Sequence, residues 1–142
     1  MPSNFKYTAG LHSVGNYQSS ARPWVKSSLV VPASGAITTA LEVSFPKVTK
    51  FVTIRNDGAP ESASCFIRVA FASGGLDESY NNYFSIAESS SFSADFRVTR
   101  LYLLSEADAA GPTATVIAGL TQIEASHLTS SWEGLAGVST TI

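Results

Sequence analysis

Leu41-Glu42-Val43-Ser44-Phe45-Pro46-Lys47 is the stretch that decides the fold class. Apolar and polar residues alternate through its first five positions, so that Leu41, Val43 and Phe45 share one face. A period of two residues is that of a β-strand with one buried face. Pro46 then turns the chain, because proline cannot donate to a strand ladder.

Similar short runs recur along the chain, and turn-forming residues such as Asn56-Asp57-Gly58 and Ser73-Gly74-Gly75 separate them. The runs cover residues 37–45, 51–54, 64–72, 83–86, 92–96, 101–104 and 115–120. Seven or eight short strands at this spacing predict an all-β fold. We expect a single antiparallel β-sandwich of jelly-roll-like form, with an immunoglobulin-like strand order as the open alternative.

The sequence predicts one domain with an arm at each end. Residues 1–36 are rich in Gly, Pro, Ser and Asn, and their apolar residues fit no single period. They are too aromatic for a disordered linker, so we expect an ordered, extended N-terminal arm. Residues 37–125 form the predicted core, and residues 126–142 form a second, C-terminal arm.

The composition describes a surface of small neutral polar groups. Of 142 residues, 22 are Ser and 12 are Thr, whereas charged residues make up 14%. The net charge of −2 conceals a polarised chain: residues 1–56 carry +5 and residues 57–142 carry −7. Without a dense basic patch, the sequence argues against direct nucleic-acid binding. Low charge suits a surface that neighbouring subunits cover.

Several other classes of protein are disfavoured. The sequence contains no run of 18 or more apolar residues, the length that a membrane-spanning helix requires. Met1-Pro2-Ser3-Asn4-Phe5-Lys6 lacks the pattern of a signal peptide, so we expect synthesis in a cytoplasm without standard export. One cysteine, Cys65, allows no internal disulfide and no cysteine-based zinc cluster.

No constellation of catalytic residues emerges from the sequence. His12 and His127 lie in the two predicted arms, and neither has an acidic residue at motif spacing. Nucleotide-binding and nucleophile-elbow motifs are absent. We therefore expect a protein that is not an enzyme and that uses neither a cofactor nor a metal.

Aromatic residues give the candidate binding positions. Trp24 and Trp132, one on each predicted arm, are the strongest candidates for an inter-subunit interface, together with Tyr17 and Arg22. The alternative is a ligand loop, Tyr80-Asn81-Asn82-Tyr83, whose rings and amides suit a sugar. In the strands, Phe66 and Tyr102 fall on the faces opposite the predicted core, and these faces are either exposed or covered.

Three parts of the chain resemble small structural proteins of tailed bacteriophages, in particular of marine and cyanobacterial phages. They are residues 7–25 (YTAGLHSVGNYQSSARPWV), residues 43–49 (VSFPKVT) and residues 81–84 (NNYF). The resemblance extends over most of the chain, and its motifs are structural rather than catalytic. No functional residue is carried over from it.

The resemblance implies a capsid decoration, or cement, protein in the virion, on the outside of the capsid. Its expected partners are the major capsid protein and copies of itself in a trimer, with no nucleic acid and no membrane. The arms would then clamp adjacent capsid subunits. Two alternatives stay open: a tail or fibre module that binds glycans or a receptor, and a head–tail connector or tail structural subunit.

Overall fold

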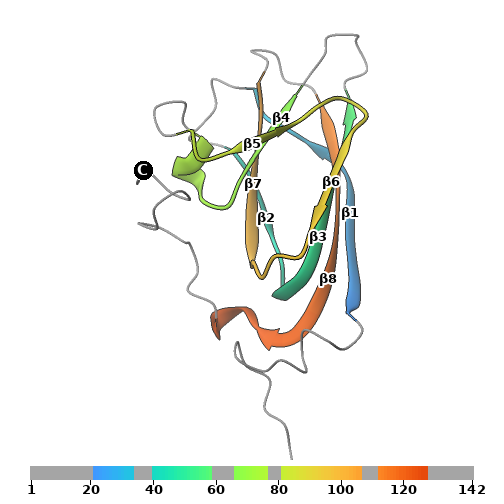
Figure 1. Cartoon of the computed structure of the whole chain (residues 1–142), viewed down its shortest axis with the longest axis vertical. Coiled ribbons are helices and arrows are strands. Elements are labelled where there is room, and N and C mark those ends of the chain that lie inside the picture. The colour runs from blue at the N-terminus through green and yellow to red at the C-terminus, as the bar shows by residue number, and fades with distance from the viewer. Residues whose placement is uncertain (1–20, 34–39, 59–65, 77–80, 107–111, 128–142) are drawn as a thin grey trace, which may run out of the picture.

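The computed structural model describes residues 21–33, 40–58, 66–76, 81–106 and 112–127, and these residues form a β-sandwich (Figure 1). Two four-stranded antiparallel sheets contain all of its strands, and its helical elements are two short 3₁₀ turns. The predicted all-β sandwich is thereby confirmed. The elements are β1 (Arg22–Val30), β2 (Leu41–Ser44), β3 (Lys47–Gly58), β4 (Ile67–Ala70), η2 (Ser73–Leu76), β5 (Phe84–Ile86), β6 (Ser91–Ala94), β7 (Arg100–Ser105), β8 (Thr113–Glu124) and η3 (Ala125–His127).

The first half of the chain pairs with the second half in reverse order. Sheet A has the strand order β1-β8-β3-β6, and sheet B has the order β2-β7-β4-β5. The pairs β1·β8, β2·β7, β3·β6 and β4·β5 are all antiparallel, as in one long hairpin whose tip lies between β4 and β5. The pairs β3·β8 and β4·β7 join neighbouring turns of that wound hairpin.

The core lies between the two sheets and follows the period-two alternation of the sequence. The inward side chains of β2, β4 and β7 all pack there, and those of β3 and β8 meet them from sheet A. The fully buried members with the largest side chains are Ile54, Ile67, Leu101, Leu103, Val31, Val52, Val69 and Val116. Burying each such side chain contributes roughly 1.5–3 kcal/mol.

The outer face of sheet B is also largely covered. Ala70, Leu76, Tyr102 and Leu104 form a second buried cluster there, with Tyr83 packed against it. Tyr102, on the side of β7 opposite the core, is 9% exposed, whereas Phe66 is 40% exposed. Of these two outward aromatics, Phe66 is thus exposed and Tyr102 is covered.

The N-terminal boundary of the core differs from the prediction, because β1 lies within the range 1–36 that was assigned to an arm. Between Lys26 and Leu29 the register of β1 against β8 shifts, and Ser28 has a φ of 57°. This bulge changes the phase of the alternation, so that Trp24 packs on the core before it and Leu29 after it. No single period runs through the segment, which made a strand look irregular. Residues 1–20 lie outside the described residues, as do residues 128–142 of the predicted C-terminal arm.

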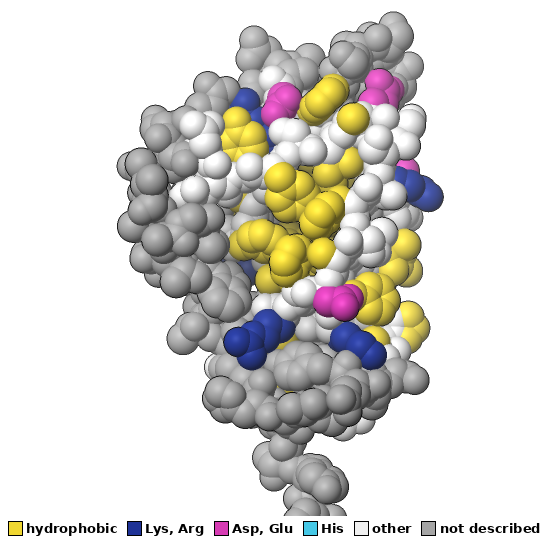
Figure 2. Space-filling model, in the orientation of Figure 1, with side chains coloured by type: hydrophobic (Ala, Val, Ile, Leu, Met, Phe, Trp, Pro, Cys, Tyr) yellow, Lys and Arg dark blue, Asp and Glu magenta, His cyan; other side chains and the backbone are white. Residues whose placement is uncertain are grey.

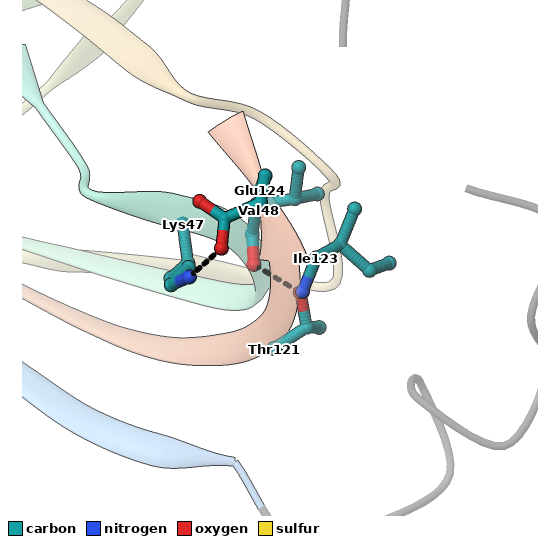
Figure 3. A network of polar contacts seen from close by, with 5 residues as sticks. All are labelled: Lys47, Val48, Thr121, Ile123 and Glu124. Carbon is teal, nitrogen blue, oxygen red and sulfur yellow. Dashed lines mark hydrogen bonds and ion pairs between the residues drawn. The ribbon is translucent and has the colours of Figure 1, made fainter. Parts of the chain in front are cut away.

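Polar contacts fix the irregular beginning of β3 against β8 (Figure 3). Thr121 Oγ1 donates a hydrogen bond to the carbonyl of Val48 at 2.7 Å, and Ile123 N–H donates to Thr121 Oγ1 at 3.2 Å. Lys47 forms an ion pair with Glu124 at the same end of the two strands. These contacts occupy polar groups at register shifts, where the regular ladder is interrupted.

The connection from β6 to β7 is tied to β3 by Thr49, which is fully buried. Its hydroxyl donates to the carbonyl of Phe96 at 2.5 Å and accepts from the N–H of Val98 at 3.0 Å. The N–H of Thr49 donates in turn to the carbonyl of Val98 at 3.1 Å. Because this connection carries the chain from sheet A to sheet B, Thr49 sets where Phe96 lies.

A testable consequence concerns Gly119 in the centre of sheet A. A Cβ at this position would lie 2.3 Å from Phe51 Cε1 and 2.6 Å from Ala21 Cβ. We expect Gly119→Ala to lower the free energy of unfolding by about 1–3 kcal/mol, because Phe51 must move away. Urea denaturation measures the effect.

The matched control is the double variant Gly119→Ala/Phe51→Leu, compared with Phe51→Leu alone. The shorter side chain makes room for the methyl group, so the alanine should cost less in that background. Equal costs in both backgrounds would show that Phe51 is not the group that the methyl displaces.

Candidate functional site

Four phenylalanines make a closed ring of contacts at the side of the sandwich where β5 and β6 form the sheet edges. Phe71 follows β4, Phe84 begins β5, Phe92 lies in β6 and Phe96 follows β6. Their ring centroids are 6.4 Å apart for Phe71 and Phe84, 4.5 Å for Phe84 and Phe92, 6.2 Å for Phe92 and Phe96, and 5.1 Å for Phe96 and Phe71. We call this group the phenylalanine quartet.

The quartet bridges the two sheets and stays partly exposed. Each of its members is half-buried and packs against the core. Figure 2 shows hydrophobic side chains gathered in the middle of this face, between the strands of the two sheets. Aromatic pairs at these separations contribute about 0.5–1.5 kcal/mol each beyond the area that they bury. The quartet therefore closes this side of the sandwich and leaves an apolar surface on it.

Asn56 of β3 holds the β5–β6 connection that borders the quartet. Its side-chain Nδ2 donates to the carbonyl of Ile86 in sheet B at 3.0 Å, and its backbone N–H donates to the carbonyl of Ser90 at 2.9 Å. The N–H of Ser89 donates to the carbonyl of Asn56 at 3.0 Å. Because Asn56 is fully buried, these bonds are shielded from water and fix the two edge strands relative to each other.

The opposite side of the sandwich holds two of the predicted interface residues. Trp24 lies in β1, is half-buried, and meets Phe45 edge-on with ring centroids 4.8 Å apart and planes at 77°. It therefore has an aromatic partner within the sandwich. Arg22 is exposed at the start of β1, opposite Leu120 of β8. Tyr17 and Trp132, the other two candidates, lie outside the described residues.

An exposed apolar strip crosses the outer face of sheet A. Val25 of β1 is 63% exposed and lies directly opposite Ile117 of β8, which is 39% exposed. Ile117 is in turn opposite Thr53 of β3, whose hydroxyl is 2.8 Å from that of Ser93 in β6. This row of four residues, one from each strand of sheet A, thus presents aliphatic and hydroxyl groups and no charge.

The alternative ligand loop is only partly described, because Tyr80 lies outside the described residues. Asn81 is exposed, with a φ of 55°, and Asn82 and Tyr83 are half-buried. The guanidinium carbon of Arg68 lies 4.7 Å from the centroid of the Tyr83 ring. One face of this ring is therefore covered by a cation and not available for stacking on a sugar.

Arg68 belongs to a charged cluster on the outer face of sheet B. Its Nε lies 3.5 Å from Glu106 Oε1, and its side chain is buried. The hydroxyl of Ser85 donates to the same Glu106 oxygen at 2.5 Å. A carboxylate and an aromatic ring thus accompany the buried guanidinium, as burial of a charge requires. Sequence reasoning missed this cluster, because β4, β5 and the residue that follows β7 supply it from distant positions.

The pKa values of Arg100 and Asp57 are shifted, and neighbouring polar groups explain both shifts. Hydrogen bonding with Tyr102 raises the pKa of Arg100, and Glu42 nearby acts in the same direction. The hydroxyl of Thr115 donates to Asp57 Oδ2 at 2.6 Å and lowers the pKa of that carboxyl, and Arg55 lowers it further. Contacts between neighbouring side chains of the sandwich therefore account for both shifts.

The described residues offer no assembled metal site. They contain no group of three or more His, Cys, Asp or Glu side chains placed to hold an ion. His12 lies outside them, and of His127 only the backbone, in η3, is described. No helix in the described part is long and apolar enough to cross a membrane.

The shifted carboxyl gives a pH prediction. Because the pKa of Asp57 is lowered in the folded protein, its contribution to stability is present above the ordinary value near 3.8 and is lost as the pH falls below it. Thr115→Val removes the donor, so we expect the pKa of Asp57 to rise and the acid-dependent loss of stability to shrink. Carboxyl-carbon NMR titration measures the pKa directly.

Thr53→Val is the matched control, since Thr53 hydrogen-bonds to Ser93 and not to a carboxylate. It should leave the titration of Asp57 unchanged. If Thr115→Val also left it unchanged, the hydroxyl would not be the cause of the shift.

Comparison of the chain with protein-family models, with curated proteins and with solved structures finds no match.

Proposed function

We propose that this chain is a non-enzymatic structural protein of a tailed-phage virion that binds and stabilises the capsid as a decoration protein. The observation that carries the proposal is the reversed pairing of the strands, from β1·β8 to β4·β5. An eight-stranded hairpin wound into two sheets is the order of a jelly roll, which is found in viral capsid domains and also in lectins and cupins. Among these, the sequence resemblance supports our proposal of a virion protein.

The surface of the sandwich agrees with a role in assembly. Val25 and Ile117 expose aliphatic area on a charge-free row of sheet A, and the quartet exposes aromatic area between the sheets. Interface cores are depleted of charge and enriched in aromatic residues. The proposed partners are the major capsid protein and further copies of this chain in a trimer, on the capsid surface of a virion that is assembled in the host cytoplasm.

The proposed mechanism is mechanical. The sandwich provides a rigid body, and the residues on either side of it, 1–20 and 128–142, provide additional contacts to neighbouring capsid subunits. Each further contact forms at high effective concentration once the first has been made, so weak contacts together hold the shell. The proposed N-terminal arm is residues 1–20 and not 1–36, because Trp24 belongs to the sandwich.

The competing functions differ in what they bind and where. A glycan-binding module would use the loop that includes Asn81–Tyr83, but Arg68 covers one face of the Tyr83 ring. A connector or tail subunit would have the same kind of surface and would be found at the single tail vertex. The stoichiometry in the particle separates this last possibility from decoration.

The test is co-sedimentation of the full chain with capsid shells assembled from the major capsid protein of the same genome. We expect saturable binding, with a stoichiometry that scales with the number of capsid subunits. Val25→Asp should weaken binding at least tenfold, because it places a charge on the exposed apolar strip. Gln122→Asp, at an exposed position of β8, is the control and should bind as the parent does.

Two outcomes would contradict the proposal. One is the absence of shell binding together with binding to a glycan array. The other is recovery of the protein only with tails or portal complexes. If the Val25→Asp variant bound the shells as tightly as the parent does, the apolar strip would not be part of the contact with the capsid. Binding would then have to come from other surfaces of the protein.

A further inference from the structure

Asp57-Gly58, at the end of β3, is the only Asp-Gly pair in the chain, and the chain contains no Asn-Gly pair. In an Asp-Gly pair the amide nitrogen of the glycine attacks the carboxyl carbon of the aspartate readily, because glycine has no side chain to obstruct the approach. Asp95, by contrast, precedes the bulky Phe96. The sequence therefore places a reactive backbone bond at one defined position of the sandwich.

The ladder between β3 and β8 is interrupted at this bond. Asn56 is opposite Ala114 and Gly58 is opposite Thr113, so Asp57 is an extra residue in β3 with no opposite residue in β8. Gly58 has a φ of 79°, a conformation that glycine adopts without strain. Side-chain contacts therefore have to hold the backbone where the regular ladder does not.

Three hydrogen bonds engage the groups that react in such a pair. Thr115 Oγ1 donates to Asp57 Oδ2 at 2.6 Å, and Arg55 Nε donates to Asp57 Oδ1 at 2.6 Å. Both carboxylate oxygens thus accept a bond, and the N–H of Gly58 donates to Asn56 Oδ1 at 2.9 Å. Asn56 is fully buried, whereas the side chain of Asp57 is 25% exposed. Water therefore reaches the carboxylate, and only these bonds restrain it.

The two donors also keep the carboxyl group in its less reactive form. The hydrogen bond from Thr115 lowers the pKa of Asp57, and Arg55 lowers it further. A carboxylate anion is a poorer electrophile than a carboxylic acid, because the neutral acid can release water. Removal of a donor therefore both frees the group to move and makes it easier to attack.

The same end of β3 supports the β5–β6 connection beside the quartet. The N–H of Asn56 donates to the carbonyl of Ser90, and the N–H of Ser89 donates to the carbonyl of Asn56. An isoaspartate at position 57 adds one carbon atom to the main chain between Asn56 and Gly58. The Gly58 N–H then no longer meets the Asn56 side chain in the same way, and the support of this connection is disturbed.

We propose that Asp57-Gly58 is a site of isoaspartate formation that these three hydrogen bonds keep closed in the folded protein, and that its conversion loosens the β5–β6 connection. A bond forms between Gly58 N and Asp57 Cγ, and one carboxyl oxygen leaves as water with the amide proton. Water then adds to the cyclic succinimide and breaks either C–N bond, giving aspartate or isoaspartate of unchanged mass. The proposal is independent of the capsid assignment.

The first test compares the folded and the unfolded full chain. Each is incubated at neutral pH, without and with guanidinium chloride, then digested, and the isoaspartyl peptides are separated and identified by mass spectrometry. We expect isoaspartate at Asp57 to form at least tenfold faster in the unfolded chain, because the three hydrogen bonds are absent from it. Asp95 is the internal control and should remain aspartate in both samples.

The second test removes the donors one at a time in the folded chain. Thr115→Val and Arg55→Met should each raise the rate at Asp57 at least threefold, because each leaves one carboxylate oxygen without its bond. Thr115→Ser keeps the hydroxyl and should stay as slow as the parent. Thr53→Val is the matched control, since it removes a β3 hydroxyl that bonds to Ser93, and it should also stay slow.

The third test measures the effect on the neighbouring connection. The isoaspartyl form is separated from the parent by ion-exchange chromatography, and amide hydrogen exchange is followed in both. We expect the Ser89 amide to exchange at least threefold faster in the isoaspartyl form, because its acceptor on Asn56 is displaced. Unchanged exchange at Ser89 would contradict the loosening of the β5–β6 connection.

Three results would overturn the site or its protection. Absence of isoaspartate at Asp57 in the unfolded chain would show that the pair does not react. Equal rates in the folded and unfolded chains would show that folding does not close the site. Rates in Thr115→Val and Arg55→Met as slow as in the parent would show that the hydrogen bonds to the carboxylate are not what protects it.

Discussion

The pairing of β3 with β8 is the constraint on which the rest of the sandwich depends. Each strand has twelve residues, and together they form the centre of sheet A. In the described part of the chain, both edge strands of that sheet, β1 and β6, pair only with a member of this pair. Its partners lie some sixty residues apart, as Thr53 and Ile117 do, so this pair forms only when most of the chain has been brought together. The contacts of Thr49, Thr121 and Lys47 at its irregular end then direct the chain into sheet B.

Winding a hairpin around this pair gives the sandwich two unlike open sides. On the side of β1 and β2, Trp24 and Phe45 meet edge-on, and a bulged nine-residue strand forms the edge. On the side of β5 and β6, four half-buried phenylalanines fill the space between very short edges. A long edge strand thus closes the first side, and aromatic side chains close the second. The second side therefore leaves more apolar surface for a partner to cover.

How far the sequence predicts this structure depends on whether a pattern is local. Leu41, Val43, Ile67 and Val69 alternate without interruption, and their strands were predicted. The bulge at Ser28 shifts the phase of β1, so the same reasoning assigned a strand to an arm. Phe92 and Phe96 share a face in the sequence pattern, but their contacts with Phe71 and Phe84 depend on the order of strands in two sheets, which no local period encodes. Burial of Tyr102 has the same cause, since residues from β4 and η2 cover it.

Short edges also explain why the exposed aromatic surface need not make the protein aggregate. A long, flat and apolar edge pairs with any strand, whereas three or four residues supply too few hydrogen bonds for that. At β1, where the edge is long, the bulge and the exposed Lys26 interrupt pairing instead. Binding at the β5–β6 side must therefore come mainly from side chains, and side chains discriminate between partners. The four half-buried rings are therefore the groups with which this side of the sandwich can recognise a partner.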